Sequence, residues 1–236
     1  SMPRSRGPLL WSAVVGLVAA AATLASAEVV ALLLAPASSP VLAVGSNQAP
    51  AQLTRKFGLD AQAVIPVQRC ALKDFDVVYS AHIAAYGSVP AMLQSAPGVT
   101  VTLFVNWLSE DQLPVMHATE LGAENYHYGR LEEIDLMLEE DGGALDSVHG
   151  YISRRGHVFH EENAVALAKV PATGRQWAAM TTAEMLEKVH ARLAPDHALE
   201  EFILRLISDT PYRRACIESL SADSVAFGRH YHVVAG

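Results

Sequence analysis

Short runs typical of β-strands dominate the chain from residue 40 onward, and they do not alternate with helices in a regular order. The clearest run is 99–108, in which every second residue from 101 to 107 is apolar, as expected for one face of a strand. Further strands are expected at 41–44, 64–80, 131–138, 147–153 and 165–170. Many short strands in a mixed order, with few long helices, favour an α+β fold over a regular βαβ fold.

The helices that the sequence predicts are few. The one at 182–193 carries four apolar residues on one face, at positions 185, 186, 189 and 193. Another is expected to begin after Ser109 and to end near Glu120, because Ser109 and Gln112 occupy the positions of a capping box. Residues 49–57 have helical character, and residues 198–220 would form one or two helices broken near Pro211.

The first 38 residues differ from the rest of the chain. Arg4 and Arg6 precede an uncharged, apolar run at 7–27, and a turn-rich linker (APASSP) ends at residue 40. Three interpretations stay open: a membrane anchor within 7–35, a secretory signal cleaved after Ala27, and a helix that packs on the domain or on another subunit. We therefore expect an apolar segment (1–38), a central domain (39–194) and a helical extension (195–236), with a membrane-associated or cytoplasmic location left undecided.

The net charge, the cysteines and the histidines of the chain limit the kinds of partner, disulfide and metal site that can be expected. The formal charge is −8 and there is no long basic run, which disfavours nucleic acid as a partner. Cys70 and Cys216 lie far apart without a CxxC partner, so two buried free thiols are expected, although one disulfide is also compatible. The histidine pairs 157/160 and 230/232 lack a clear third ligand, so no metal site is predicted.

Two passages carry a resemblance to a known family. Residues 41–48 (VLAVGSNQ) place Gly45, Ser46 and Asn47 at the end of a predicted strand, and residues 101–138 run from a strand through a helix that ends at Glu120 to a tyrosine, Tyr126, and another strand. This order resembles the γ-glutamylcyclotransferase-like family over about residues 40–194. The resemblance implies a small mixed β-barrel with flanking helices, no metal and no organic cofactor.

The resemblance also implies an activity. Enzymes of this family cyclise a γ-glutamyl group to 5-oxoproline and release an amine or an amino acid. By position, Glu120 would be the catalytic acid–base group. The substrate-binding residues would be Gly45, Ser46, Asn47, Gln48 and Tyr126.

The chemistry agrees with these residue types. A partly buried carboxylate can move a proton from the substrate's α-nitrogen to the departing nitrogen, and a glycine-containing turn offers backbone N–H groups to a carboxylate or an oxyanion. One position departs from the family, because Val44 stands where the family usually has tyrosine. Tyr79, Tyr86 or Tyr126 would have to fill that space, or the pocket accepts a different substrate.

Two alternatives follow from the same residues. The fold could be a non-catalytic module that binds a small amino-acid-like ligand, for which Val44 is the motive, or an interaction protein tethered by residues 7–35. A small γ-glutamyl-type substrate is the expected partner, and a homodimer is compatible with the sequence.

Overall fold

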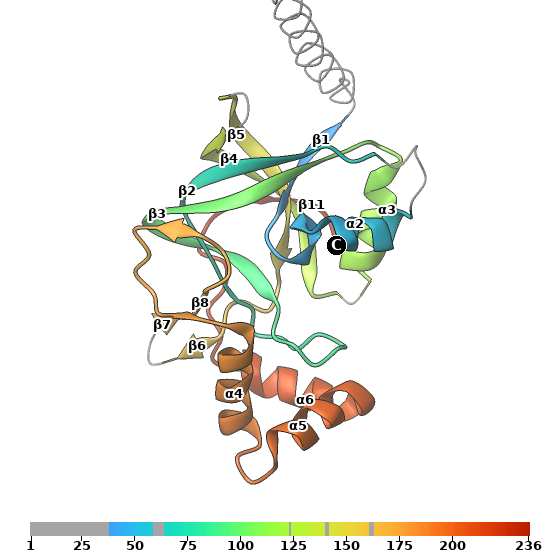
Figure 1. The fold of residues 1–236 in the computed structure, drawn as a ribbon, viewed down its shortest axis with the longest axis vertical. Coiled ribbons are helices and arrows are strands. Elements are labelled where there is room, and N and C mark those ends of the chain that lie inside the picture. Colours follow the sequence, from blue (N-terminus) through green and yellow to red (C-terminus); the bar gives the residue numbers. More distant parts are fainter. Residues whose placement is uncertain (1–37, 59–63, 123, 140–141, 161–162) are drawn as a thin grey trace, which may run out of the picture. The chain divides into compact units, whose positions relative to one another are not determined.

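The computed structural model describes residues 38–58, 64–122, 124–139, 142–160 and 163–236. The chain divides into units Ser1–Ser38 and Ser39–Gly236, and the second is described here (Figure 1). The predictions of an anchor, a signal or a packing helix within residues 7–35 therefore lie outside the described residues. Within the described ranges, no helix combines the length and the apolarity that a membrane crossing requires.

Five strands close into a barrel (Figure 1). They are β1 (Ser39–Ala43), β2 (Val67–Tyr79), β3 (Ala91–Leu108), β4 (Tyr126–Leu138) and β5 (Ala144–Ser153). Their order is β2-β3-β1-β5-β4, and pairing of β4 with β2 completes the ring. Only the β1–β5 pair in this ring is parallel. The predicted α+β fold with a small mixed β-barrel is confirmed.

Local irregularities bend the long strands. Asp74 has a φ of 63° where the β2–β3 register shifts, and Glu133 has a φ of 54° where the β4–β5 register shifts. Such bulges increase twist and curvature and so help strands of this length to close a ring. The prediction that the central strand begins at residue 99 was wrong, because β3 starts at Ala91 and continues through Pro97-Gly98. That dipeptide sits opposite the Asp74 bulge, where Gly98 N–H donates to the Asp74 carboxylate.

The barrel interior is filled by apolar side chains from every strand of the ring. Along each strand, every second side chain points into the barrel, as expected for a closed barrel. The fully or almost fully buried members include Leu42, Leu72, Val101, Leu103, Val105, Leu131, Leu136 and Val148.

Helices α2 (Pro50–Phe57) and α3 (Gln112–Glu120) flank one side of the barrel, and a short 3-10 turn, η1 (Ser46–Gln48), precedes α2. Leu53 of α2 and Met116 of α3 share a small core with Leu108 of β3. The predicted capping box is present at the start of α3, because Ser109 and Gln112 bond each other's backbone N–H groups.

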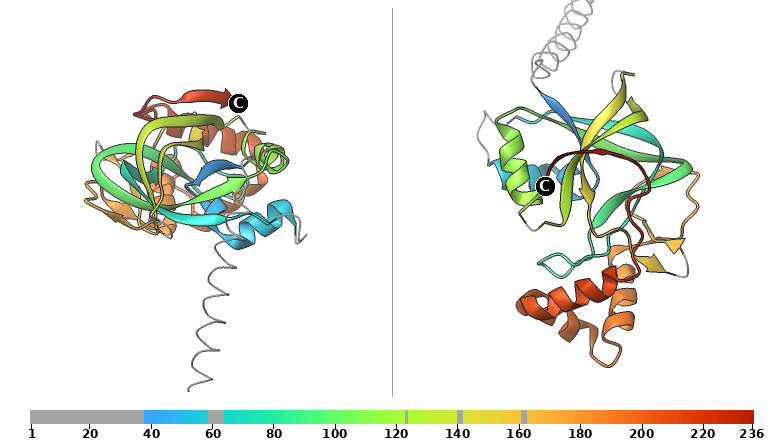
Figure 2. Two further views of the ribbon diagram at one scale, coloured as in Figure 1. Left: turned by 90° about the horizontal axis from the view of Figure 1, so that it is seen from above. Right: turned by 180° about the vertical axis from the view of Figure 1, so that it is seen from behind.

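Three further helices form a lobe beside the barrel (Figures 1 and 2). They are α4 (Thr182–Leu193), α5 (Leu199–Ser208) and α6 (Thr210–Ser221). Their shared core contains Met185, Val189, Phe202, Leu206 and Leu220, together with Tyr79 and Ile83 from the barrel side. The predicted helix at 182–193 and the break near Pro211 are confirmed, with Asp209 capping α6.

Further short strands follow, of which the first two pair with each other in a separate two-stranded sheet and the others join the sheet of the barrel. They are β6 (Phe159–His160), β7 (Asn163–Ala164), β8 (Ala166–Leu167), β9 (Ala172–Thr173), β10 (Ala179–Met180) and β11 (His232–Ala235). The predicted strand at 165–170 is reduced to β8, because the chain turns at Val170, whose N–H bonds to the Leu167 carbonyl. β11 pairs antiparallel with β4 and lies beside it in both views of Figure 2.

Candidate active site

A cavity of about 780 Å³ opens between the end of β1, helix α2, the end of α3 and the loop that joins β2 to β3. A volume of this size suits a small-molecule ligand. All six residues that the sequence predicted for the site line it: Gly45, Ser46, Asn47, Gln48, Glu120 and Tyr126. The structure therefore brings together residues that lie far apart in the sequence.

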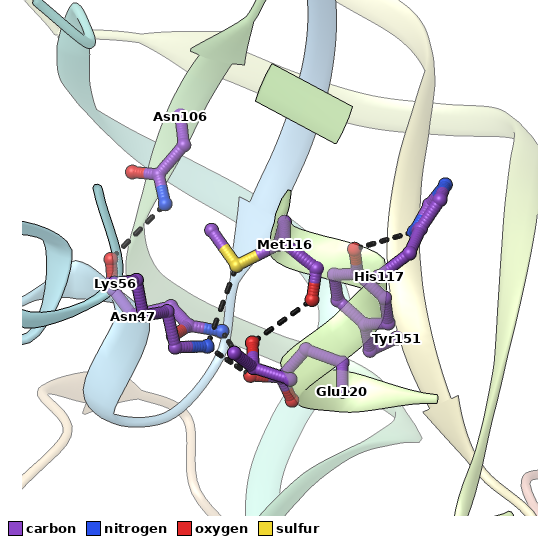
Figure 3. Close-up of polar contacts among 8 residues, drawn as sticks. Asn47, Lys56, Asn106, Met116, His117, Glu120 and Tyr151 are labelled. Atoms are coloured by element: carbon purple, nitrogen blue, oxygen red, sulfur yellow. Dashed lines mark hydrogen bonds and ion pairs between the residues drawn. The ribbon is translucent and has the colours of Figure 1, made fainter. Parts of the chain in front are cut away.

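Glu120 is the last residue of α3, so its carboxylate projects from the helix end into the cavity wall. Its side chain is 19% exposed. One oxygen, Oε1, accepts a hydrogen bond of 3.1 Å from Asn47 Nδ2 and forms an ion pair with Lys56 Nζ (Figure 3). The carboxylate is thus held in one orientation by two donors on the same oxygen.

The turn after β1 is anchored from the barrel. Asn106 of β3 donates through Nδ2 to the Asn47 carbonyl at 3.0 Å (Figure 3). Ala49 N–H closes the 3-10 turn on the Ser46 carbonyl. Among the described residues, the buried Asn47 Oδ1 has no hydrogen-bond partner. An unpaired buried acceptor of this kind is unusual in a folded protein, and here it belongs to a residue that lines the cavity.

Two tyrosines stand close to Glu120. Tyr126 begins β4, and its ring meets the edge of the His82 ring at 5.6 Å between centroids. Tyr151 of β5 bonds through its hydroxyl to His117 Nδ1 at 2.9 Å. Burial raises the pKa of both phenols above the ordinary value, and the Glu120 charge raises both further. Both phenols therefore stay protonated near neutral pH and can donate hydrogen bonds.

Val44, which replaces the expected tyrosine, packs against the barrel core and lines the cavity. The three tyrosines expected to compensate also line it, but they differ in their freedom to do so. The Tyr79 hydroxyl donates to the Met180 carbonyl at 3.0 Å, and Tyr86 is 68% exposed. Of these three, Tyr126 is the partly buried phenol whose pKa is raised by the Glu120 charge as well as by burial.

Lys56 is the residue that the sequence analysis missed. Ala49, Gln52 and Lys56 all line the cavity. Gln52 and Lys56 are four residues apart and therefore share one face of α2, and Ala49 directly precedes the helix three residues before Gln52. Asn47, a predicted site residue, lies just before this helix. This position could have indicated that one face of α2 borders the site, and Lys56 lies on that face. Arg55 and Lys169 also line the cavity and are exposed.

A buried histidine forms part of the cavity wall. His82 is 4% exposed, and its Nδ1 bonds to Ser80 Oγ at 3.1 Å. Ser80 Oγ also bonds to Ser153 Oγ at 2.9 Å. Burial, with a smaller contribution from Arg155, lowers the pKa of His82 to about 4, so the ring is neutral near pH 7. In the ranges that the structure describes, no three His, Cys, Asp or Glu side chains gather in a way that could hold a metal ion.

No family model matches the sequence, and no curated protein matches it. Solved structures do resemble the fold. One titled gamma-glutamyl cyclotransferase is 12% identical, with 82% of this chain and 92% of that chain covered and a TM-score of 0.41. An uncharacterized protein from Homo sapiens is 12% identical, with 84% and 94% covered and a TM-score of 0.41.

A gamma glutamyl cyclotransferase specific to glutathione, from yeast, is also similar. It is 11% identical to this chain, with 80% of this chain and 97% of that chain covered and a TM-score of 0.36. These likenesses concern the course of the backbone alone.

Proposed function

We propose that the protein is an enzyme of the γ-glutamyl cyclotransferase type, which converts a γ-glutamyl group to 5-oxoproline and releases an amine or an amino acid. One observation carries the proposal: Glu120, the turn at residues 45–48 and Tyr126 line a single cavity, and Glu120 is bonded to Asn47 of that turn. Reactions of this type need a proton carrier and a carboxylate-binding turn within reach of one small substrate.

The proposed reaction is intramolecular. The α-ammonium of the γ-glutamyl group first loses one proton to solvent, and the resulting amine attacks the γ-carbonyl carbon. A carbon–nitrogen bond forms while the carbonyl oxygen becomes an oxyanion. Glu120 takes the second proton from the α-nitrogen and gives it to the departing nitrogen as the original amide bond breaks. The released amine then takes up a proton from solvent.

Residues around Glu120 have complementary roles in this proposal. Asn47 holds the Glu120 carboxylate beside the substrate through its Nδ2, at 3.1 Å from Oε1. Backbone N–H groups of the turn, with the Ser46 hydroxyl and the Gln48 amide, hold the substrate carboxylate, and Tyr126 donates to the oxyanion. Since the nucleophile belongs to the substrate, orientation supplies much of the rate enhancement.

A second candidate is a non-catalytic module that binds a small amino-acid-like ligand in the same cavity. The observation that favours it is Val44, which lines the cavity and cannot donate the hydrogen bond that the family's tyrosine would offer. Tight binding of γ-glutamyl compounds without turnover would distinguish this function from catalysis.

The experiment that tests the proposal measures 5-oxoproline release from a panel of γ-glutamyl amines, amino acids and dipeptides. Glu120→Gln should abolish release while binding of the same compounds, followed by thermal shift, persists. Glu110→Gln is a matched control, because Glu110 is exposed and does not line the cavity. Release that survives Glu120→Gln would remove Glu120 from the mechanism, and no release from any compound would favour the binding module.

A further inference from the structure

Lys56 is held in an unusual position for a lysine. Its side chain is only 5% exposed, although it lies on the cavity-facing side of α2. A lysine ammonium is strongly hydrated and is rarely buried without a partner. The partner here is Glu120, which lies 64 residues further along the chain, on α3.

The contacts of Lys56 are arranged around one oxygen of Glu120. Lys56 Nζ and Asn47 Nδ2 both meet Oε1, and Lys56 Nζ also lies 3.4 Å from Met116 Sδ (Figure 3). Met116 is fully buried and one helical turn before Glu120. The ammonium is therefore fixed between the interior of α3 and the carboxylate at its end.

Because both donors bind the same oxygen, the two oxygens of the Glu120 carboxylate have different surroundings. Rotation of the carboxylate about its last bond would have to break both the Asn47 bond and the ion pair before the other oxygen could accept them. Charge-assisted contacts of this kind restrict orientation more strongly than neutral hydrogen bonds. As long as Lys56 remains charged and in place, Oε2 is the oxygen left to exchange a proton with a bound substrate.

We infer that Lys56 is a positioning residue, which fixes the Glu120 carboxylate by binding Oε1 and thereby presents Oε2 to the substrate. This inference rests on the proposed function. Lys56 touches no reacting atom in this scheme, and it acts only through Glu120. Its contribution is to keep the proton carrier in the orientation that the reaction requires.

The test compares Lys56→Met, which keeps the length and removes the charge, with Lys56→Arg, which keeps the charge. Lys188→Met is the matched control, because Lys188 is an exposed residue of α4 outside the cavity. Lys56→Met should lower kcat for 5-oxoproline release by about 10- to 100-fold with little change in KM, because orientation is lost while binding groups remain. Lys56→Arg should recover most of kcat, and Lys188→Met should match the wild type.

A spectroscopic measurement keeps the inference testable without turnover. The ¹³C signal of the Glu120 side-chain carboxyl is identified in labelled protein by its loss in Glu120→Gln. In Lys56→Met this signal should move, whereas in Lys188→Met it should stay. Circular dichroism checks that each variant folds, and Lys56→Gln replaces the methionine variant if that variant does not fold.

The outcomes separate the two claims. Suppose first that the wild type releases 5-oxoproline. The positioning role is then overturned if Lys56→Met has the same kcat as the wild type, or if Lys56→Arg is no more active than Lys56→Met. If the wild type releases none, the proposed function fails and the carboxyl signal decides the rest: a signal moved in Lys56→Met supports fixation of Glu120 by Lys56, and an unmoved signal refutes it.

Discussion

A buried ion pair beside the cavity allows a quantitative prediction. Asp76 of β2 has a fully buried side chain, and Arg175 meets both of its oxygens through Nε and Nη2, each at 2.8 Å. Arg175 also donates to the Val170 carbonyl at 2.9 Å, and Val170 lines the cavity. The pair thus fastens the segment after β8 to the barrel and supports one wall of the candidate site.

Arg175→Met removes the guanidinium and leaves the Asp76 carboxylate buried, with the Val77 N–H at 2.8 Å as a remaining donor. Breaking a buried pair from one side costs about 3–5 kcal/mol, since the remaining charge loses its compensation. For a domain of this size, each kcal/mol lowers Tm by about 2–4 °C, so the expected loss is roughly 6–20 °C. Urea unfolding should show a lower midpoint with an unchanged slope.

Two variants make the reasoning refutable. Arg69→Met breaks an ion pair with Glu139 in which the arginine side chain is 49% exposed, and it should cost less than about 1 kcal/mol. Adding Asp76→Asn to Arg175→Met should recover part of the stability, because the buried charge is then removed. A loss below about 1 kcal/mol for Arg175→Met, or no recovery in the double variant, would show that burial of the Asp76 charge does not determine the effect.

Two further predictions concern pH and thiol reactivity. The pKa of His82 is about 4 in the fold and about 6.5 in the unfolded chain, so the unfolded chain binds the extra proton as pH falls, and stability is lost from about pH 6.5 downward. His82 alone should contribute about 2 kcal/mol of loss between pH 7 and pH 5, measured by urea unfolding; an equal loss in His82→Gln would contradict this assignment. Burial raises the pKa of Cys70 to about 12 and also raises that of Cys216, and both free thiols are buried. A disulfide reagent at pH 8 should therefore label both thiols only after unfolding, and rapid labelling of the native protein would be inconsistent with their burial.

Several strands of the barrel could be predicted because the signal of each strand is local, whereas the barrel itself was expected only from the family resemblance. Alternation of apolar residues along 99–108 is a property of one strand, and the capping pair Ser109 and Gln112 marks the start of α3 within four residues. The bounds of β3 could not be predicted, because the part from Ala91 is extended through its pairing with residues 75–79 of β2. The same holds for β11, whose pairing partner on β4 lies about a hundred residues earlier in the chain.

The candidate site, too, could be predicted only in part from the sequence. Gly45, Ser46, Asn47 and Glu120 were expected from the family resemblance that two short passages carry, and they line one cavity. Lys56 was missed because its role depends on a pairing with Glu120, and a lysine on a short amphipathic helix is ordinarily a solvated residue. The free state of Cys70 and Cys216 agrees with the expectation drawn from their spacing.

The parallel pairing of β1 with β5 has a consequence for how the protein acquires its site during synthesis. Val41 pairs with His149, so the ring stays open until most of the chain has been made. Pairing over such a sequence separation slows folding, since the intervening loop must be ordered first. Ser46 and Asn47 therefore leave the ribosome early, yet a nascent chain that ends before His149 lacks the β5 partner of β1 and cannot close the ring beside them. Truncated products of translation that end before His149 should therefore lack a closed ring beside the pocket, although they carry Ser46, Asn47 and Glu120.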